Sequence, residues 1–362
     1  MKGPLGIGAH LLGLHLGEDR SQVALKPEDH NRSYNGRKIP LSVTISCTHR
    51  CNLACAHCQS ENSDTKDDIS TERFLALIDE MAEAGTTRVG FTGGEPLMRK
   101  DFGRIVERCR ERGLIVSVVS NGWLVKRNID WLKGIALLFL SLDGGREAHD
   151  KIRGPGNYEK FIEAARAAQD AGIPVAALPT LCSMNYGCVP EMIDSVVSLK
   201  LHWMVGLIQS GFTQRTEQDI TRNQIREMIE AISKTPNMRA SGKYLRFAQG
   251  AEPPERCWAG IGYSIIAPNG MMYPCFPAEF DHAGYSGVAM KEGDSFSGPA
   301  EAESYRGVSI LDKPFAQAFS ELRLYRRTCG TCQLACHLES NYLYDFNPGS
   351  ILNSFKLMSP VA

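Results

Sequence analysis

Strand-like and helix-like segments alternate along residues 38 to about 235, and this alternation restricts the fold more than any other feature. Six apolar β-type runs occur there: 39–46, 88–93, 115–122, 137–144, 175–182 and 203–208. Helical segments lie between them, including 70–85, 101–113 and 158–172, and each of these three ends at a glycine. Strands separated by helices of this length predict βαβ units and a parallel sheet. Six units are enough for an open, partial (β/α)6 barrel of TIM-like type and too few for a closed eightfold barrel.

The alternation stops near residue 240. Residues 263–275, "YSIIAPNGMMYPC", predict a β-hairpin that turns at Pro268-Asn269-Gly270. A second group of cysteines follows at 329–336. We therefore expect an α/β barrel followed by a small, cysteine-rich α+β domain. The predicted boundaries are 1–37 for an N-terminal extension, 38–240 for the barrel, 241–340 for the second domain and 341–362 for a tail.

Composition and charge exclude several classes of protein. The chain has 362 residues and a formal net charge of −1, so no overall basic field attracts nucleic acid or an anionic membrane. No window approaches the roughly 18 uninterrupted apolar residues typical of a membrane span, and the N-terminus lacks a signal-peptide pattern. We therefore expect a cytoplasmic protein. Thiols stay reduced in that compartment, so twelve cysteines indicate metal binding rather than disulfides.

Four of the cysteines fall within residues 47–58, "CTHRCNLACAHC". A zinc knuckle, a disulfide cluster and an iron–sulfur site are the three interpretations. Structural zinc sites commonly use paired C-x2-C units, and this segment offers only one such pair. If Cys47 ends the first strand, Cys51-x3-Cys55-x2-Cys58 remains in the following loop, where βα barrels place their active sites. Three thiolates on a four-iron cube leave one iron free to bind a small molecule.

Cys51-x3-Cys55-x2-Cys58 after the first strand of a partial barrel resembles the radical S-adenosylmethionine (SAM) superfamily. Companion segments strengthen the resemblance: "FTGGEPL" at 91–97, "SNG" at 120–122, "SLDG" at 141–144 and "HDKIRG" at 149–154. The resemblance implies a [4Fe–4S] cluster on the three cysteines and SAM chelated to its open iron. It also implies the SAM-binding candidates Gly93, Gly94, Glu95, Asn121, Ser141 and Arg153. Glu95 would pair with the methionine ammonium, and Ser141 and Arg153 would contact ribose and carboxylate.

The later cysteines resemble the auxiliary-cluster extension of some of these enzymes, in its longer (SPASM) or shorter (twitch) form. They are Cys257, Cys275, Cys329, Cys332 and Cys336. Five thiols are too few for two fully ligated cubes, so the resemblance implies one auxiliary [4Fe–4S] cluster. Its ligands would be Cys257, Cys275 and two of the last three cysteines. A structural zinc on four of these thiols is the alternative.

The resemblance implies an enzyme that cleaves SAM reductively to a 5′-deoxyadenosyl radical and abstracts hydrogen from an unactivated C–H bond. Its product would be a matured peptide, a small natural product or a cofactor. A radical alcohol dehydrogenase that passes an electron to the auxiliary cluster is one alternative. A non-catalytic iron–sulfur or zinc protein is another. Only about forty residues precede the barrel, which weakens the peptide hypothesis because many peptide modifiers carry a recognition domain there.

The implied partners are SAM, a peptide or small-molecule substrate, and an external electron donor such as flavodoxin or ferredoxin. The remaining cysteines have simpler interpretations. Cys109 lies in a predicted helix and is expected in the core. Cys182 and Cys188 follow the fifth strand and would either pack or face the substrate. The sequence identifies no general acid or base.

Overall fold

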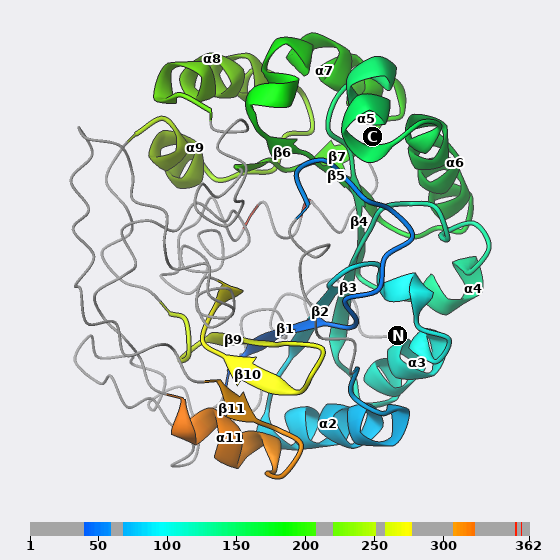
Figure 1. The fold of residues 1–362 in the computed structure, drawn as a ribbon, viewed down its shortest axis with the longest axis vertical. Coiled ribbons are helices and arrows are strands. Elements are labelled where there is room, and N and C mark those ends of the chain that lie inside the picture. The colour runs from blue at the N-terminus through cyan, green and yellow to red at the C-terminus, as the bar shows by residue number, and fades with distance from the viewer. Residues whose placement is uncertain are drawn as a thin grey trace.

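The computed structural model describes residues 40–58, 68–207, 220–250, 258–276 and 307–322, and the isolated positions 352 and 356. Within these ranges, six parallel strands neighbour one another in chain order (Figure 1). They are β1 (Ser42–Ser46), β2 (Arg88–Thr92), β3 (Ile115–Ser120), β4 (Leu137–Ser141), β5 (Val175–Leu178) and β7 (His202–Trp203). The predicted parallel α/β fold is therefore confirmed. A short parallel pair, β6 (Thr180–Leu181) and β8 (Gly206–Leu207), extends the last two units.

Helices cover the outer side of the curved row of strands (Figure 1). They are α2 (Thr71–Ala84), α3 (Phe102–Glu111), α4 (Ile129–Leu132), α5 (Arg146–Arg153), α6 (Asn157–Asp170), α7 (Val189–Ser198), α8 (Arg222–Ser233) and α9 (Gly242–Ala248). Two 3₁₀ turns, η3 (Pro96–Met98) and η4 (Ser183–Cys188), precede α3 and α7. The ends of α2 follow local chemistry, since the Ser70 hydroxyl accepts from the Arg73 amide and Gly85 ends the helix at φ 102°.

The core forms where the inner face of α2 and α3 packs on the strands. Phe91 of β2 lies between Phe74 of α2 and Phe102 of α3, with ring centroids 6.2 and 5.3 Å away. These side chains are fully or almost fully buried. Alternation along β3, where every second residue is buried, shows how a period of two sends one set of side chains into this core. Cys109 lies in the same core, as its helical position predicts.

The segment after the barrel joins the same sheet. β9 (Tyr263–Ile266) pairs in parallel with β1, and β10 (Met271–Tyr273) pairs antiparallel with β9 across the predicted turn. β11 (Val308–Ser309) then completes a nine-stranded sheet of order β11-β10-β9-β1-β2-β3-β4-β5-β7. The predicted hairpin is confirmed. It covers the edge of β1, whose backbone groups would otherwise lack partners. The domain boundary near residue 240 stays a prediction.

The chain after β11 is fastened to α2. Arg73 donates to the carbonyls of Ile310 and Lys313 at 2.8 and 3.1 Å, and Glu80 accepts from the amide of Phe315 at 2.7 Å. Phe315 begins α11 (Phe315–Glu321), whose apolar face is buried against the core. Residues 307–322 are therefore held to the outside of the barrel beside α2 (Figure 1).

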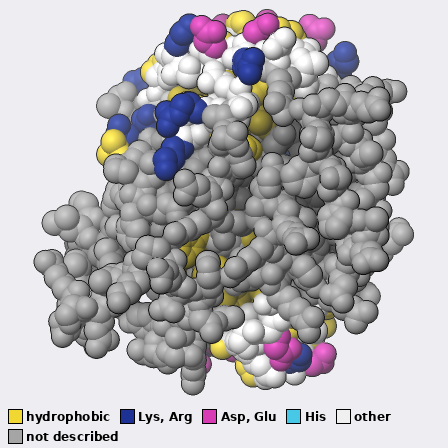
Figure 2. Space-filling view, turned by 90° about the vertical axis from the view of Figure 1, so that its left-hand side faces the viewer, with side chains coloured by type: hydrophobic (Ala, Val, Ile, Leu, Met, Phe, Trp, Pro, Cys, Tyr) yellow, Lys and Arg dark blue, Asp and Glu magenta, His cyan; other side chains and the backbone are white. Residues whose placement is uncertain are grey.

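Basic side chains gather on the side of the molecule that carries α8 and α9. Lys and Arg residues are grouped in the upper part of the view in Figure 2, which faces the left-hand side of Figure 1. None of the helices in the described ranges has both the length and the apolar character needed to cross a bilayer.

Candidate active site

The three predicted ligand cysteines lie in the loop that follows β1, at the carboxyl edge of the parallel strands. The Sγ atom of Cys51 accepts from the Leu53 amide at 3.4 Å, and the Cys58 amide donates to the Cys55 carbonyl at 3.0 Å. The Ala56 amide donates to the Ile152 carbonyl at 2.8 Å, which ties the loop to α5. Cys55 is buried, whereas Cys51 and Cys58 are partly exposed.

The thiols influence one another electrostatically. Burial raises the pKa of Cys51 and raises that of Cys55 to about 11, and the charges of the neighbouring thiols add to both shifts. Arg153 opposes the shift at Cys55. The thiols of Cys51 and Cys55 are therefore protonated at neutral pH in the metal-free loop. Binding of a metal would release these protons, because thiolate is the form that ligates.

The donor set fits an iron–sulfur cluster better than a single zinc ion. In the described part of the chain, no three His, Cys, Asp or Glu side chains converge as ligands of one metal ion. A structural zinc would require its thiolates on a single atom. A [4Fe–4S] cube instead takes each thiolate on a different iron, so its ligands are spread apart. Cys51, Cys55 and Cys58 supply three soft sulfur donors in this arrangement.

Gly93 and Gly94 follow β2 and lie directly against the cysteine loop. A Cβ on Gly93 would stand 2.5 Å from the Thr48 carbonyl oxygen, and a Cβ on Gly94 only 2.3 Å from that of Arg50. The Gly94 amide donates to the Thr48 carbonyl at 2.7 Å. Gly93 also has φ 127°, which L side chains rarely adopt. The sequence analysis named both glycines as SAM-binding candidates, and in the structure they let the backbone of the cysteine loop approach closely.

Glu95 is the buried carboxylate of this site. It has no exposed surface, and burial raises its pKa to about 7 although three hydrogen bonds favour the charged form. These bonds come from the Leu97 amide at 3.2 Å, the Ser120 hydroxyl at 3.0 Å and the Asn121 amide at 2.8 Å. Cys51 is close enough for the charge of Glu95 to raise its pKa. A buried carboxylate beside a cluster loop is suited to hold an ammonium group.

Asn121 connects the end of β3 to the cysteine loop. Its Nδ2 donates to the Oδ1 of Asn52 at 2.9 Å and lies 3.7 Å from the Sγ of Cys51. Its Oδ1 accepts from the Trp123 amide at 3.0 Å. The structure therefore brings this predicted residue to the site, in contact with a proposed ligand cysteine.

Asp143 is a site residue that the sequence analysis did not single out. It is fully buried. Its carboxylate accepts hydrogen bonds from the Arg153 Nε at 2.5 Å and from the Thr180 amide at 3.0 Å. The His57 Nε2 lies 3.4 Å away. Burial alone would raise the pKa of Asp143, but the charge of Arg153 lowers it to about 2. Its position in "SLDG", just past the end of β4, was the available signal.

Arg153 joins this carboxylate to the cluster loop. Its Nη1 lies 3.9 Å from the Sγ of Cys55. His149 accepts from the Asp143 amide through Nδ1 at 3.0 Å, and burial lowers its pKa to about 4, so it is neutral. Burial likewise lowers the pKa of His57. Asp143 is thus a negative centre that faces the guanidinium of Arg153.

The other predicted residues are distributed as follows. Ser141 ends β4 at the same edge of the sheet, opposite Leu178 of β5. Cys182 is buried at the start of η4, and Cys188 is partly buried at its end. Cys275 follows β10 and is partly buried. Four predicted auxiliary ligands lie outside the described residues: Cys257, Cys329, Cys332 and Cys336.

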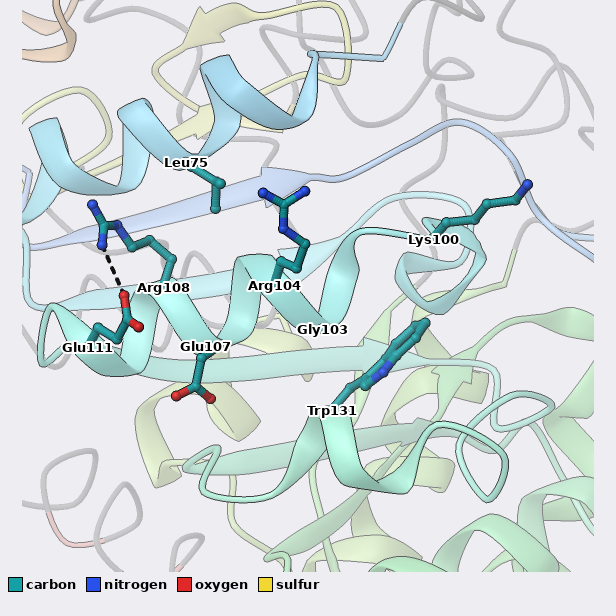
Figure 3. Close-up of a pocket in the computed structure, with 8 residues that line it drawn as sticks. All are labelled: Leu75, Lys100, Gly103, Arg104, Glu107, Arg108, Glu111 and Trp131. Carbon is teal, nitrogen blue, oxygen red and sulfur yellow. Dashed lines mark hydrogen bonds and ion pairs between the residues drawn. The ribbon is translucent and has the colours of Figure 1, made fainter.

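A separate pocket lies on the outer side of the barrel, over α3 (Figure 3). Its volume is about 650 Å³, and it is bounded by Leu75 of α2, Trp131 of α4 and a row of charged side chains on α3. Glu111 is paired with Arg108 at 2.9 Å, and Glu107 with Arg110 at 2.7 Å. None of the predicted site residues lines this pocket, so it is distinct from the cysteine loop.

Comparison with known proteins agrees with this geometry. Residues 45–197 match the family model of the Radical SAM superfamily. The PqqA peptide cyclase of Rhizobium meliloti is 27% identical over 277 residues, which cover 72% of this chain and 73% of that protein. The Fe-coproporphyrin III synthase of Methanosarcina barkeri is 31% identical over 216 residues, which are 57% of this chain. The chain spans about half of the length of that second relative, 54%.

Solved structures share the fold. Streptococcus suis SuiB bound to S-adenosylmethionine superposes with a TM-score of 0.61 at 17% identity, covering 86% of this chain and 76% of SuiB. The structure of anSMEcpe with bound AdoMet and Cp18Cys peptide gives 0.57 at 15% identity, covering 88% of this chain and 100% of that one. Residues 45–197 therefore form a domain of the radical SAM superfamily, whose enzymes use a [4Fe–4S] cluster together with S-adenosylmethionine.

Proposed function

We propose that this chain binds a [4Fe–4S] cluster through Cys51, Cys55 and Cys58 and abstracts hydrogen from an unactivated C–H bond of its substrate. The chemistry that the reduced cluster and SAM supply when bound is the release of a 5′-deoxyadenosyl radical. The observation that carries the proposal is the convergence on one loop of three thiols, the buried Glu95 and the Asp143–Arg153 pair.

Each residue of the site would bind a different part of SAM. Glu95 would pair with the ammonium group of the methionine, which would favour the carboxylate form of a group whose pKa burial has raised. Arg153 would offer its guanidinium to the methionine carboxylate while Asp143 keeps it oriented. Ser141 and Asn121 would contact the nucleoside, and Gly93 and Gly94 would keep the GGEP segment tight against the loop.

A peptide is the substrate class that we propose first. The similarity to PqqA peptide cyclases extends well beyond residues 45–197, since that of Rhodopseudomonas palustris aligns over 82% of this chain and 84% of its own length. An alignment that covers so much of both chains includes residues after the barrel as well as the barrel itself. The expectation that a short N-terminal extension disfavours a peptide therefore has less weight than this extended similarity.

A small molecule is the second candidate. The relative with the highest identity quoted above is named as an Fe-coproporphyrin III synthase, although the alignment spans 57% of this chain. Oxidation of an alcohol, with an auxiliary cluster as electron acceptor, belongs to the same alternative. Peptide and small-molecule activity differ in what stimulates SAM cleavage, so one assay can separate them.

An auxiliary cluster of SPASM or twitch type is part of the proposal. Cys275 follows β10, and β10 lies in the same sheet as β1, two strands away. A cluster held by Cys257, Cys275 and two of Cys329, Cys332 and Cys336 would thus be attached to the barrel through the sheet. An external donor of flavodoxin or ferredoxin type and a cytoplasmic location complete the proposal. Twelve cysteines grouped in patterns that suit metal binding support the location.

The first experiment is metal analysis after anaerobic reconstitution of the wild type and of a Cys51→Ala/Cys55→Ala/Cys58→Ala variant. We expect about eight irons per chain in the wild type and about four in the variant, at four per cube. About four irons falling to none, with zinc retained, would contradict the auxiliary cluster alone. Zinc without iron in the wild type would contradict the radical mechanism.

The second experiment measures 5′-deoxyadenosine formed from SAM by dithionite-reduced protein. Candidate precursor peptides and iron porphyrins are added separately, and the triple cysteine variant is the control. We expect product in the wild type and stimulation by a peptide. Stimulation by a porphyrin alone would favour the small-molecule alternative. Intact clusters without any 5′-deoxyadenosine would favour a non-catalytic iron–sulfur protein.

A further inference from the structure

Arg99 is a buried arginine that follows the GGEP segment, and only 3% of its surface is exposed. Its guanidinium makes four hydrogen bonds. Nε and Nη2 donate to the two carboxylate oxygens of Asp101 at 3.0 and 2.7 Å. Nη1 donates to the Cys47 carbonyl at 3.1 Å, and Nη2 to the Ile69 carbonyl at 3.1 Å. A buried guanidinium with so many fixed partners has one orientation.

The two carbonyls lie on either side of the three cysteines in the sequence. Cys47 is the residue after β1, and Ile69 lies just before Ser70, the N-cap of α2. Cys51, Cys55 and Cys58 all lie between these two contacts. One side chain therefore joins the start and the end of the segment that carries every proposed ligand of the radical cluster.

We call the hydrogen bonds of Arg99 to Asp101, Cys47 and Ile69 the clamp. Neighbouring side chains hold it in place. The Thr71 hydroxyl donates to Asp101 at 2.7 Å, which ties the carboxylate to the first turn of α2. Burial alone would raise the pKa of Asp101, but the bonds from Arg99 and Thr71 lower it, so this group is a carboxylate. The Arg99 guanidinium lies 5.1 Å from the ring centroid of Phe74 in the core.

We propose that Arg99 is a positioning residue for the radical cluster: through Cys47 and Ile69 it sets the separation of the loop ends and thereby the placement of the three thiols. The proposal rests on the ligand role of Cys51, Cys55 and Cys58. A long loop closed by fixed contacts has fewer conformations, so less entropy is lost when its thiols take up a cluster. Side chains that orient ligands typically change metal affinity by about 10–100-fold when altered.

The same clamp reaches the hairpin after the barrel. The Ile69 amide donates to the Pro268 carbonyl at 2.8 Å, and Pro268 lies in the turn between β9 and β10. Ile69 is therefore bonded to Arg99 through its carbonyl and to the hairpin through its amide. The end of the cysteine loop is held between the two.

Arg73 supplies a matched control within the chain. Arg73 is partly buried and, like Arg99, forms a bidentate pair with a carboxylate, here that of Glu80. It also donates to two backbone carbonyls, those of Ile310 and Lys313. Its contacts fasten the segment after β11 and none of them reaches the cysteine loop. Lysine at either position keeps the charge but cannot form the forked pair while bonding two carbonyls.

The experiment compares Arg99→Lys, Arg73→Lys, wild type and the triple cysteine variant. Iron loss to a chelator under anaerobic conditions is followed with time, and the phase absent from the triple variant is assigned to the radical cluster. The electron paramagnetic resonance spectrum of the reduced cluster is recorded with and without SAM, together with the Tm of each metal-free protein. Asp101→Asn tests the same clamp from its other side.

We expect Arg99→Lys to speed iron loss in the assigned phase about tenfold and to alter the spectrum. Asp101→Asn should act in the same direction. Arg73→Lys should lower the Tm with neither effect. If Arg99→Lys and Arg73→Lys lose iron at the same rate and give the same spectrum, the clamp is wrong while the ligand assignment stands. If the wild type shows no phase that the triple variant lacks, the ligand assignment is wrong, and the proposal falls with it.

Discussion

Arg153 donates from Nε to Asp143 Oδ2 at 2.5 Å, and its Nη1 lies 3.9 Å from the Sγ of Cys55. The side chain of Asp143 is 1% exposed and that of Arg153 is 10% exposed, so water compensates poorly for either charge if the other is removed. We expect Asp143→Asn to destabilise the metal-free protein by about 3–5 kcal/mol, the usual cost of an unpaired buried charge. Urea unfolding of the metal-free protein measures this free energy.

The exposed pair of Arg146 and Glu159 is the control for this prediction, because more than half of each side chain is accessible to solvent. Glu159→Gln should change the free energy of unfolding by less than about 1 kcal/mol. Equal effects of the two substitutions would show that Asp143 is better solvated than its burial indicates.

Glu95 makes stability depend on pH. Its pKa of about 7 in the folded chain lies above the ordinary value of 4.5, so the folded state holds its proton to higher pH than the unfolded state does. This group therefore destabilises the fold increasingly as pH rises from about 4.5 to about 7. The total is about 3 kcal/mol at 1.36 kcal/mol per pKa unit.

The test compares wild type with Glu95→Gln at pH 5 and at pH 8, in metal-free protein. The Gln variant does not titrate, so its stability relative to wild type should rise by that amount between the two pH values. A constant hydrogen-bond difference between the variants cancels in this comparison. A difference that does not change with pH would show that Glu95 titrates near its ordinary pKa.

Position 94 requires glycine because the backbone of the cysteine loop leaves no room there for a side chain. In Gly94→Ala the new methyl would meet the Arg50 carbonyl oxygen at 2.3 Å and its carbon at 2.7 Å, both backbone atoms that cannot rotate away. We expect a loss of about 1–3 kcal/mol, as for overpacking, and loss of iron from the radical cluster. Gly187→Ala, where no atom lies within 4 Å, should change stability by less than about 0.5 kcal/mol.

Glu80 holds the segment after β11 through both Arg73 and the Phe315 amide. We expect Glu80→Ala to speed amide hydrogen exchange in residues 308–321 about tenfold or more, because local opening there becomes easier. Exchange in β3, which is paired with β2 and β4 inside the sheet, serves as the internal control. Equal protection of residues 308–321 in both proteins would mean that the core contacts of Phe315 and Phe319 suffice.

Several parts of the fold could be predicted because they depend on local chemistry. Alternating burial identifies β3, and the Ser70 cap with Gly85 bounds α2 to within one residue. The order of the six parallel strands follows from the rule that successive βα units neighbour one another. The cysteine loop and the GGEP segment could be placed at one edge of the sheet, because parallel strands all end there.

The long-range pairings could not be predicted in the same way. Asp143, Arg153 and Cys55 are far apart along the chain, and no periodicity shows that they meet, since a charged residue at a strand end is usually solvated. The sequence analysis placed β9 within a second domain, 241–340, and did not predict that β9 pairs with β1. Whether an edge strand is left open or covered depends on the shape of the folded barrel.

The sequence by itself determined the type of scaffold and the identity of the proposed thiol ligands, because the spacing of apolar residues and of cysteines acts over a few residues. Only the tertiary structure decided what surrounds those thiols. It placed Arg99 on both ends of their loop, packed Gly93 and Gly94 against its backbone and buried Glu95 beside Cys51. These relationships depend on how strand ends and helices are brought together in three dimensions, and burial then sets the charge of each group.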